Sequence, residues 1–66
     1  MKGPKEKPEV QLSGEDGNAF SILGATIKAL RKAGADEEYI DKYQTEAMSG
    51  NYDELLQTTM GYVNVL

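Results

Sequence analysis

The stretch "AFSILGATIKALRKAG", residues 19–34, has the residue spacing of an amphipathic helix. Apolar side chains recur at intervals of three and four residues, which places them on one face: Phe20, Leu23, Ile27 and Leu30. Three cations fall in the last two turns, where positive charge complements the negative end of the helix dipole. Gly34 can adopt the left-handed conformation that commonly ends a helix. The stretch therefore predicts a helix over residues 19–33.

Gly24 is the irregular residue in this helix. A glycine inside a helix costs about 1 kcal/mol relative to alanine. The position therefore indicates a neighbour that needs room, and another helix is a better candidate for that neighbour than a ligand.

Two shorter helices are predicted further along the chain, over residues 37–48 and 52–60. Asp36 and Asn51 are suited to cap them, and acidic residues follow each cap in the first turn. Gly50 is placed for a left-handed exit from the first of these helices, and Gly61 for the end of the second. The expected core joins residues of all three helices and the last strand: Phe20, Leu23, Ile27, Leu30, Ile40, Tyr43, Leu55, Leu56 and Val63.

The two ends of this region alternate between apolar and polar residues. "EVQLS", residues 9–13, and "YVNVL", residues 62–66, both have the period of a half-buried strand. The order strand, three helices, strand predicts one α+β domain over residues 9–66, with a two-stranded ribbon on three helices and its strand direction left open. Residues 1–8, "MKGPKEKP", combine charge, proline and glycine, so we expect a flexible basic tail.

The turn "GEDGNAF", residues 14–20, is the one candidate for a ligand or metal site. Its glycines expose backbone N–H groups, and Glu15, Asp16 and Asn18 offer oxygen atoms. The acids repel a phosphate, whereas the start of a helix is a poor neighbour for a cation. A turn followed by a helix cap at Asn18 explains every residue, so we expect no metal and no cofactor here.

The composition argues against several classes of function. The 66 residues include no Cys and no His, which removes the commonest residues for proton transfer, thiol chemistry and transition-metal binding, and leaves no expected catalytic residue. The net charge of −4 disfavours a nucleic-acid binder. No stretch approaches the length of a membrane span, which is about 20 apolar residues. We expect a cytoplasmic protein without enzymatic activity.

A protein partner is the remaining expectation. Four tyrosines are many for a thin core, and exposed tyrosine is enriched at interfaces. A two-stranded ribbon is also marginal by itself and offers a free edge. The residues expected to contact a partner are Glu15, Asp16, Asn18, Tyr62 and Asn64. The hypothesis is a small protein-interaction module; the alternatives are a homodimer through the ribbon and a small-ligand or metal-binding domain at the turn of residues 14–18.

Three segments together resemble a known group of sequences: "VQLSGEDGNAFSILG", "ALRKAG" and "EAMSGNYDELLQTTMGYVNV". They are similar to small uncharacterised bacterial and phage proteins in which a GxDGNAF turn and a C-terminal V-x-V strand recur. The resemblance covers nearly all residues after residue 8. It implies no activity and no site residue, and it suggests a modulator of a host or phage protein.

Overall fold

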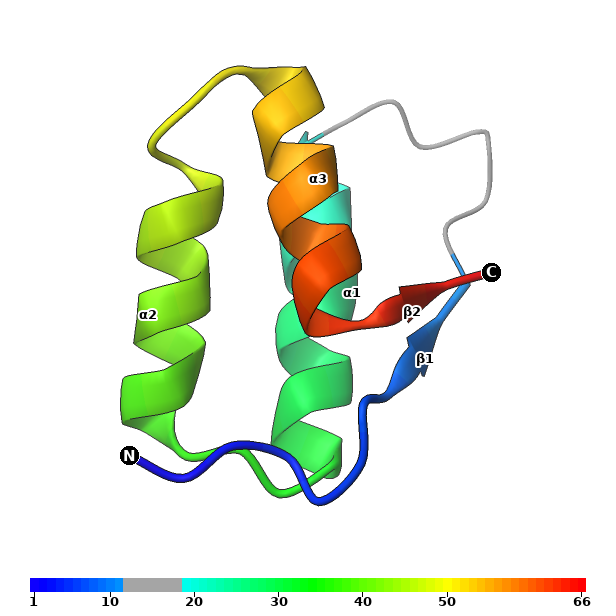
Figure 1. The fold of residues 1–66 in the computed structure, drawn as a ribbon, viewed down its shortest axis with the longest axis vertical. Coiled ribbons are helices and arrows are strands. Elements are labelled where there is room, and N and C mark those ends of the chain that lie inside the picture. The colour runs from blue at the N-terminus through cyan, green and yellow to red at the C-terminus, as the bar shows by residue number, and fades with distance from the viewer. Residues whose placement is uncertain (12–18) are drawn as a thin grey trace.

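A computed structural model of the chain describes residues 1–11 and 19–66. Three helices, α1 (Ala19–Lys32), α2 (Glu37–Ala47) and α3 (Tyr52–Tyr62), lie between two short strands, β1 (Glu9–Val10) and β2 (Asn64–Val65). Figure 1 shows the helices side by side, with the ribbon against α1 and the end of α3. The α+β class and its element order are confirmed.

The two strands are parallel, with Glu9 opposite Asn64 and Val10 opposite Val65. The reason is the number of helices between them. Each helix reverses the direction of the chain, so three helices return it to the end of the bundle from which β1 starts (Figure 1). Both strands therefore begin at the same end of the molecule.

The buried face of α1 confirms Leu23 and Leu30 of the predicted stripe, but not Phe20. Phe20 is 73% exposed, so its assignment to the core is wrong. The buried residues of α1 are Ile22, Leu23, Thr26 and Leu30. They centre on the series 22, 26 and 30, which passes through a threonine. A pattern of large apolar residues omits Thr26 and therefore misplaces the centre of the buried face. With the buried face centred on residues 22, 26 and 30, Phe20 lies on the outside of the helix.

The predicted starts of α2 and α3 are confirmed. The Asp36 side chain accepts a hydrogen bond from the Tyr39 N–H at 2.8 Å, and the Asn51 side chain accepts one from the Glu54 N–H at 2.9 Å. These bonds satisfy backbone donors that have no partner within the helix. A capping side chain at the right position therefore determines each start.

The helix ends are predicted less well. Gly34 has a φ of 103°, which confirms the left-handed end of the first helix, but no other described glycine has a positive φ. Gly50 is therefore not a left-handed exit. Helix α2 ends instead where the Ser49 hydroxyl donates to the Glu46 carbonyl at 2.7 Å. Gly61 lies inside α3, which continues to Tyr62.

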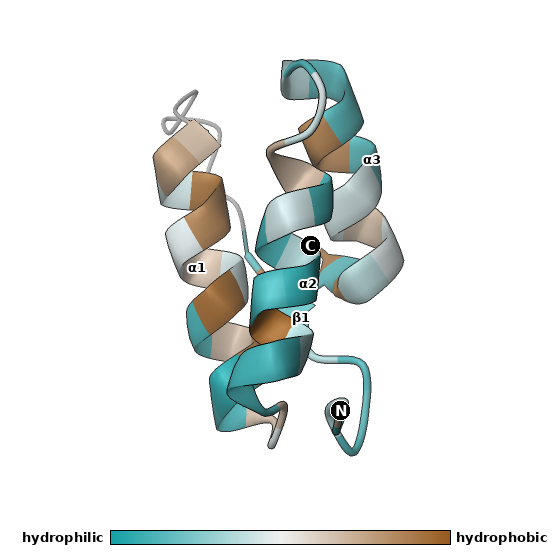
Figure 2. Cartoon of the chain, turned by 90° about the vertical axis from the view of Figure 1, so that its left-hand side faces the viewer, coloured by the Kyte–Doolittle hydropathy of each residue, from teal (hydrophilic) through white to brown (hydrophobic). Residues whose placement is uncertain are grey.

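Within residues 1–11 and 19–66, ten residues form the buried apolar core: Val10, Ile22, Leu23, Leu30, Ala35, Ile40, Tyr43, Ala47, Leu55 and Val63. Ile27 and Leu56 are partly buried against it. Tyr52 and Met60, the other large apolar residues of α3, have the spacing of its buried face with Leu55, Leu56 and Thr59, yet both are exposed. Figure 2 shows the outer surface of α2 as mostly hydrophilic, so the core lies behind it, between the three helices.

The expected reason for Gly24 is also wrong. Apart from its two chain neighbours and the nearby backbone of α1, no atom of the described residues lies within 4 Å of the position that a Cβ would occupy there. Gly24 lies on an exposed part of α1, so no neighbouring helix requires a glycine.

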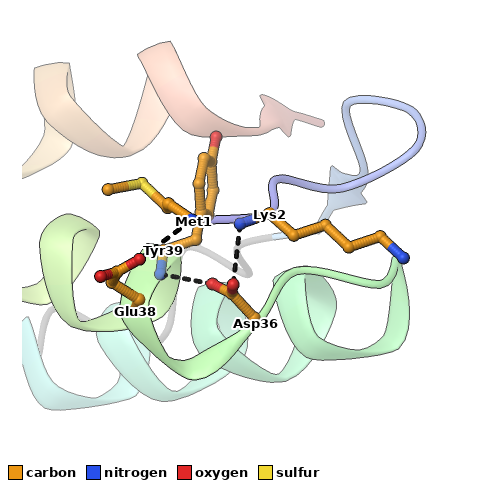
Figure 3. A network of polar contacts seen from close by, with 5 residues as sticks. All are labelled: Met1, Lys2, Asp36, Glu38 and Tyr39. Atoms are coloured by element: carbon orange, nitrogen blue, oxygen red, sulfur yellow. Dashed lines mark hydrogen bonds and ion pairs between the residues drawn. The ribbon is translucent and has the colours of Figure 1, made fainter.

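Residues 1–8 follow a definite path along the turn between α1 and α2, which differs from the flexible tail that composition predicts. The Lys2 N–H donates to the Asp36 carboxylate at 2.7 Å (Figure 3). The Asp36 N–H donates to the Lys2 carbonyl at 2.9 Å. The Lys5 N–H donates to the Ala33 carbonyl at 3.1 Å. Two of these bonds join backbone groups and the third joins a backbone N–H to a carboxylate, and a count of apolar side chains predicts none of them.

Candidate functional site

The five residues proposed to contact a partner fall into two groups. Glu15, Asp16 and Asn18 lie outside the described residues. Tyr62 and Asn64 lie at the end of α3 and on β2, two residues apart. Asn64 is exposed, whereas the Tyr62 side chain is half-buried.

Tyr62 belongs to a cluster of tyrosine rings on the α2 and α3 helices. Its ring meets that of Tyr39 at 5.5 Å between centroids and that of Tyr43 at 5.0 Å, both edge to face. Such pairs contribute about 0.5–1.5 kcal/mol beyond the area they bury. The Tyr43 hydroxyl is 2.7 Å from the Thr59 hydroxyl, so the buried ring has a polar partner. The cluster packs α2 against α3.

The phenol of Tyr62 is held in its neutral form. Burial raises the pKa of Tyr62, and the hydrogen bond that its hydroxyl donates to the Glu46 carboxylate raises this pKa further. A catalytic tyrosine needs a pKa shifted toward neutrality. The shift here has the opposite direction, so the Tyr62 phenol is poorly suited to proton transfer near neutral pH.

The outer edge of β2 has open backbone groups. The Asn64 N–H donates to the Pro8 carbonyl at 2.8 Å and the Leu66 N–H donates to the Val10 carbonyl at 2.9 Å. Backbone groups alternate in direction along a strand, so the N–H and C=O of Val65 point away from β1. No hydrogen bond to another described residue uses them. The Val65 residue is 37% exposed, with exposed residues on both sides.

A second open feature is an apolar groove at the end of the bundle opposite the N-terminus, which we call the end groove. It lies where α1 and α3 begin and α2 ends, and its volume is about 210 Å³. The apolar side chains that line it include Phe20, Leu23, Ala47, Met48, Tyr52 and Leu55.

A third open feature is a depression of about 450 Å³ along the N-terminal segment. Lys5 and Lys7 line it together with Glu6 and Glu9, so it favours neither an anion nor a cation. Within residues 1–11 and 19–66, no cluster of three acidic residues is placed to hold a metal ion. In that same part of the chain, no helix combines the length and apolar character needed to cross a membrane.

Sequence reasoning missed Val65 and Met48 as parts of open surfaces. The alternation of "YVNVL" placed Val65 on the same face as the buried Val63, and the strand is too short for both to reach the core. The predicted helix over residues 37–48 includes Met48. Helix α2 ends instead at Ala47, so Met48 lies beyond its last turn and is exposed.

We compared the chain with protein-family models, with curated proteins and with solved structures, and none of the three comparisons found a match.

Proposed function

We propose that the protein is a small non-enzymatic module that binds a partner protein, and that an extended segment of the partner adds to the outer edge of β2. The observation that carries this proposal is the unpaired backbone of Val65. A strand edge of this kind supplies hydrogen bonds to an added strand, while neighbouring side chains supply specificity. The exposed residues Asn64 and Leu66 flank Val65 and would contact the added strand.

The size of the sheet supports the same proposal. A ribbon of two strands is marginal in water unless it gains support from helices or further strands. Here β1 is anchored by the buried Val10, whereas both residues of β2 are exposed. A third strand would extend the sheet on the side where it has least support. The resemblance to small bacterial and phage proteins suggests that the partner is a host or phage protein in the cytoplasm, whose activity the chain would modulate.

A proline at position 65 tests the proposal. It removes the outward N–H of β2 but leaves the two N–H groups that bond to β1, and proline is tolerated at strand edges. Val65→Thr is the matched control, because threonine keeps the N–H and suits a strand. Both variants, checked for folding by circular dichroism, are used beside the wild-type chain to capture proteins from lysate of the producing cells.

We expect a specific partner to be captured by the wild-type chain and by Val65→Thr, and to be lost with Val65→Pro. Equal capture by all three chains would show that the edge of β2 is not used. A second copy of the chain is the alternative occupant of the same edge. Sedimentation over a concentration series tests it, since a dimer that Val65→Pro abolishes would favour self-association and a monomer at every concentration would exclude it.

A further inference from the structure

The end groove is too small for a typical small-molecule site. Pockets for drug-sized ligands usually hold about 300–1,000 Å³, whereas this groove holds about 210 Å³. Its lining contains no buried charged residue that would orient a ligand. It has room for one or two side chains of a partner, which is the scale of an anchor in a protein interface.

The side chains on its rim are of the kind found in binding surfaces. Phe20 is 73% exposed and Met48 is 54% exposed, and Tyr52 beside them is also exposed. Aromatic residues and methionine are enriched in interfaces, and the flexible methionine side chain adapts to partners of different shape. The described structure therefore brings exposed residues of this kind together over an apolar floor that includes the buried Leu23 and Leu55.

Every charged side chain in the segments that build the groove is acidic. Residues 19–27 carry no charge, and residues 43–66 carry Glu46, Asp53 and Glu54 but no lysine or arginine. Three helix ends also meet at the groove: the negative end of α2, which has no basic residue in its last turn, and the positive ends of α1 and α3. Each helix end is equivalent to about half an elementary charge, so the three ends together are weaker than the three carboxylates. The net charge around the groove is therefore negative and favours a cation.

We infer that the end groove is a docking site for a segment of a partner protein that carries apolar side chains next to lysine or arginine. The apolar side chains fill the groove, and the cations meet the acidic rim and the end of α2. This site is separate from the edge of β2, and the inference does not depend on strand addition there.

A second copy of this chain is a poorer occupant. Six of its seven cations lie in residues 2–7 and 28–32, at the opposite end of the molecule. The same end carries five acidic residues, Glu6, Glu9, Asp36, Glu37 and Glu38, and two of them form ion pairs with Arg31 and the N-terminal amine. With the N-terminal amine included, that end has a net charge of +2, and its cations are interspersed with five acidic residues. It therefore complements the rim less well than a segment whose charged residues are all lysine or arginine.

Two synthetic peptides test the inference. They share one length and one pattern of leucines, and their polar positions are all lysine in one and all glutamate in the other. Binding is measured by titration of the labelled peptide into the full chain at low and high salt. The location of binding is measured from the NMR shifts of the backbone amides. We expect the lysine peptide to bind, to shift Phe20, Met48 and Tyr52, and to bind more weakly as salt screens the rim charges.

Two exposed methionines provide a matched pair of variants. Met48 lies in the groove and is 54% exposed, while Met60 lies outside it and is 56% exposed. Met48→Lys and Met60→Lys change the net charge by the same amount, so a general electrostatic effect is equal in both. We expect Met48→Lys to weaken the lysine peptide about tenfold or more, which corresponds to about 1.4 kcal/mol. We expect Met60→Lys and Val65→Pro to leave its affinity within about twofold, a difference of less than about 0.5 kcal/mol.

Several results would overturn the inference. Equal binding of the glutamate peptide would remove the charge argument, and equal weakening by the two methionine variants would place the contact elsewhere. Absence of binding by the lysine peptide up to about 1 mM would leave no measurable site. In the absence of peptide, the NMR shifts of the groove residues could instead depend on protein concentration. If Met48→Lys removes that dependence, the groove binds a second copy of the chain.

Discussion

At the scale of single residues, two buried threonines show how a polar group is accommodated in a thin core. Thr26 and Thr59 are both fully buried. The Thr59 hydroxyl lies 2.7 Å from the Tyr43 hydroxyl, whereas the Thr26 Oγ1 has no hydrogen-bond partner among the described residues. A buried polar group without a partner costs about 1–3 kcal/mol. Thr26 is therefore a weak point of the core and Thr59 is not.

Replacement of each threonine by valine should give opposite results. Thr26→Val removes an unpaired hydroxyl, so we expect the free energy of unfolding to rise by up to about 1 kcal/mol. Thr59→Val leaves the Tyr43 hydroxyl without its partner in the core, and we expect a loss of about 1–3 kcal/mol. Urea denaturation of both variants measures these changes. A clear loss of stability in Thr26→Val would mean that its hydroxyl has a partner after all.

The raised pKa of Tyr62 makes a prediction at alkaline pH. In the unfolded chain a tyrosine titrates near 10.0, and in the folded protein the Tyr62 phenol holds its proton to higher pH. The contribution of the neutral Tyr62 phenol to the free energy of unfolding is complete below pH 10. It is lost as the pH rises above 10 through the pKa of the folded state. Tyr62→Phe lacks this titration, so its melting temperature should fall less steeply than that of the wild type above pH 10. An identical fall of the melting temperature with pH in the two proteins would contradict the raised pKa of Tyr62.

At the scale of elements, local chemistry predicts where helices start better than where they end. Asp36 and Asn51 are recognisable as caps because their side chains bond to nearby backbone groups, and this depends on the sequence within three residues. The end of α2 depends on the Ser49 hydroxyl, and the last turn of α3, past Gly61, packs against α2, which is distant in the sequence. The buried face of α1 was misjudged because it centres on Thr26, which a pattern of large apolar residues omits.

Glycine substitutions separate the helix interior from the helix end. No described atom restricts a Cβ at Gly24, so Gly24→Ala should stabilise the protein by about 0.5–1 kcal/mol. Gly34 has a φ of 103°, a conformation that alanine adopts with strain, so Gly34→Ala should lower stability by more than about 1 kcal/mol. Thermal melting compares the two variants. A loss in Gly24→Ala would show that this glycine has a role beyond α1.

At the scale of the whole molecule, the element order was predictable from the sequence, but the strand direction and the open surfaces were not. Three predicted helices give parallel strands only if each helix packs antiparallel to the one before it, and this packing is a long-range property. The N-terminal segment is attached through backbone hydrogen bonds to Ala33 and Asp36, which no composition indicates. Of the residues expected to meet a partner, Asn64 is exposed beside the open edge, and the Tyr62 ring is largely engaged in packing.

The central claim is that the backbone of Val65 is open for an added strand while its neighbours are bonded to β1. Amide hydrogen exchange measured by NMR on the isolated monomer tests it directly. We predict slower exchange at Asn64 and Leu66, whose N–H groups donate to Pro8 and Val10, and fast exchange at Val65. Protection of Val65 in the monomer would show that the edge is already covered, and equally fast exchange at all three residues would show that the ribbon itself does not form.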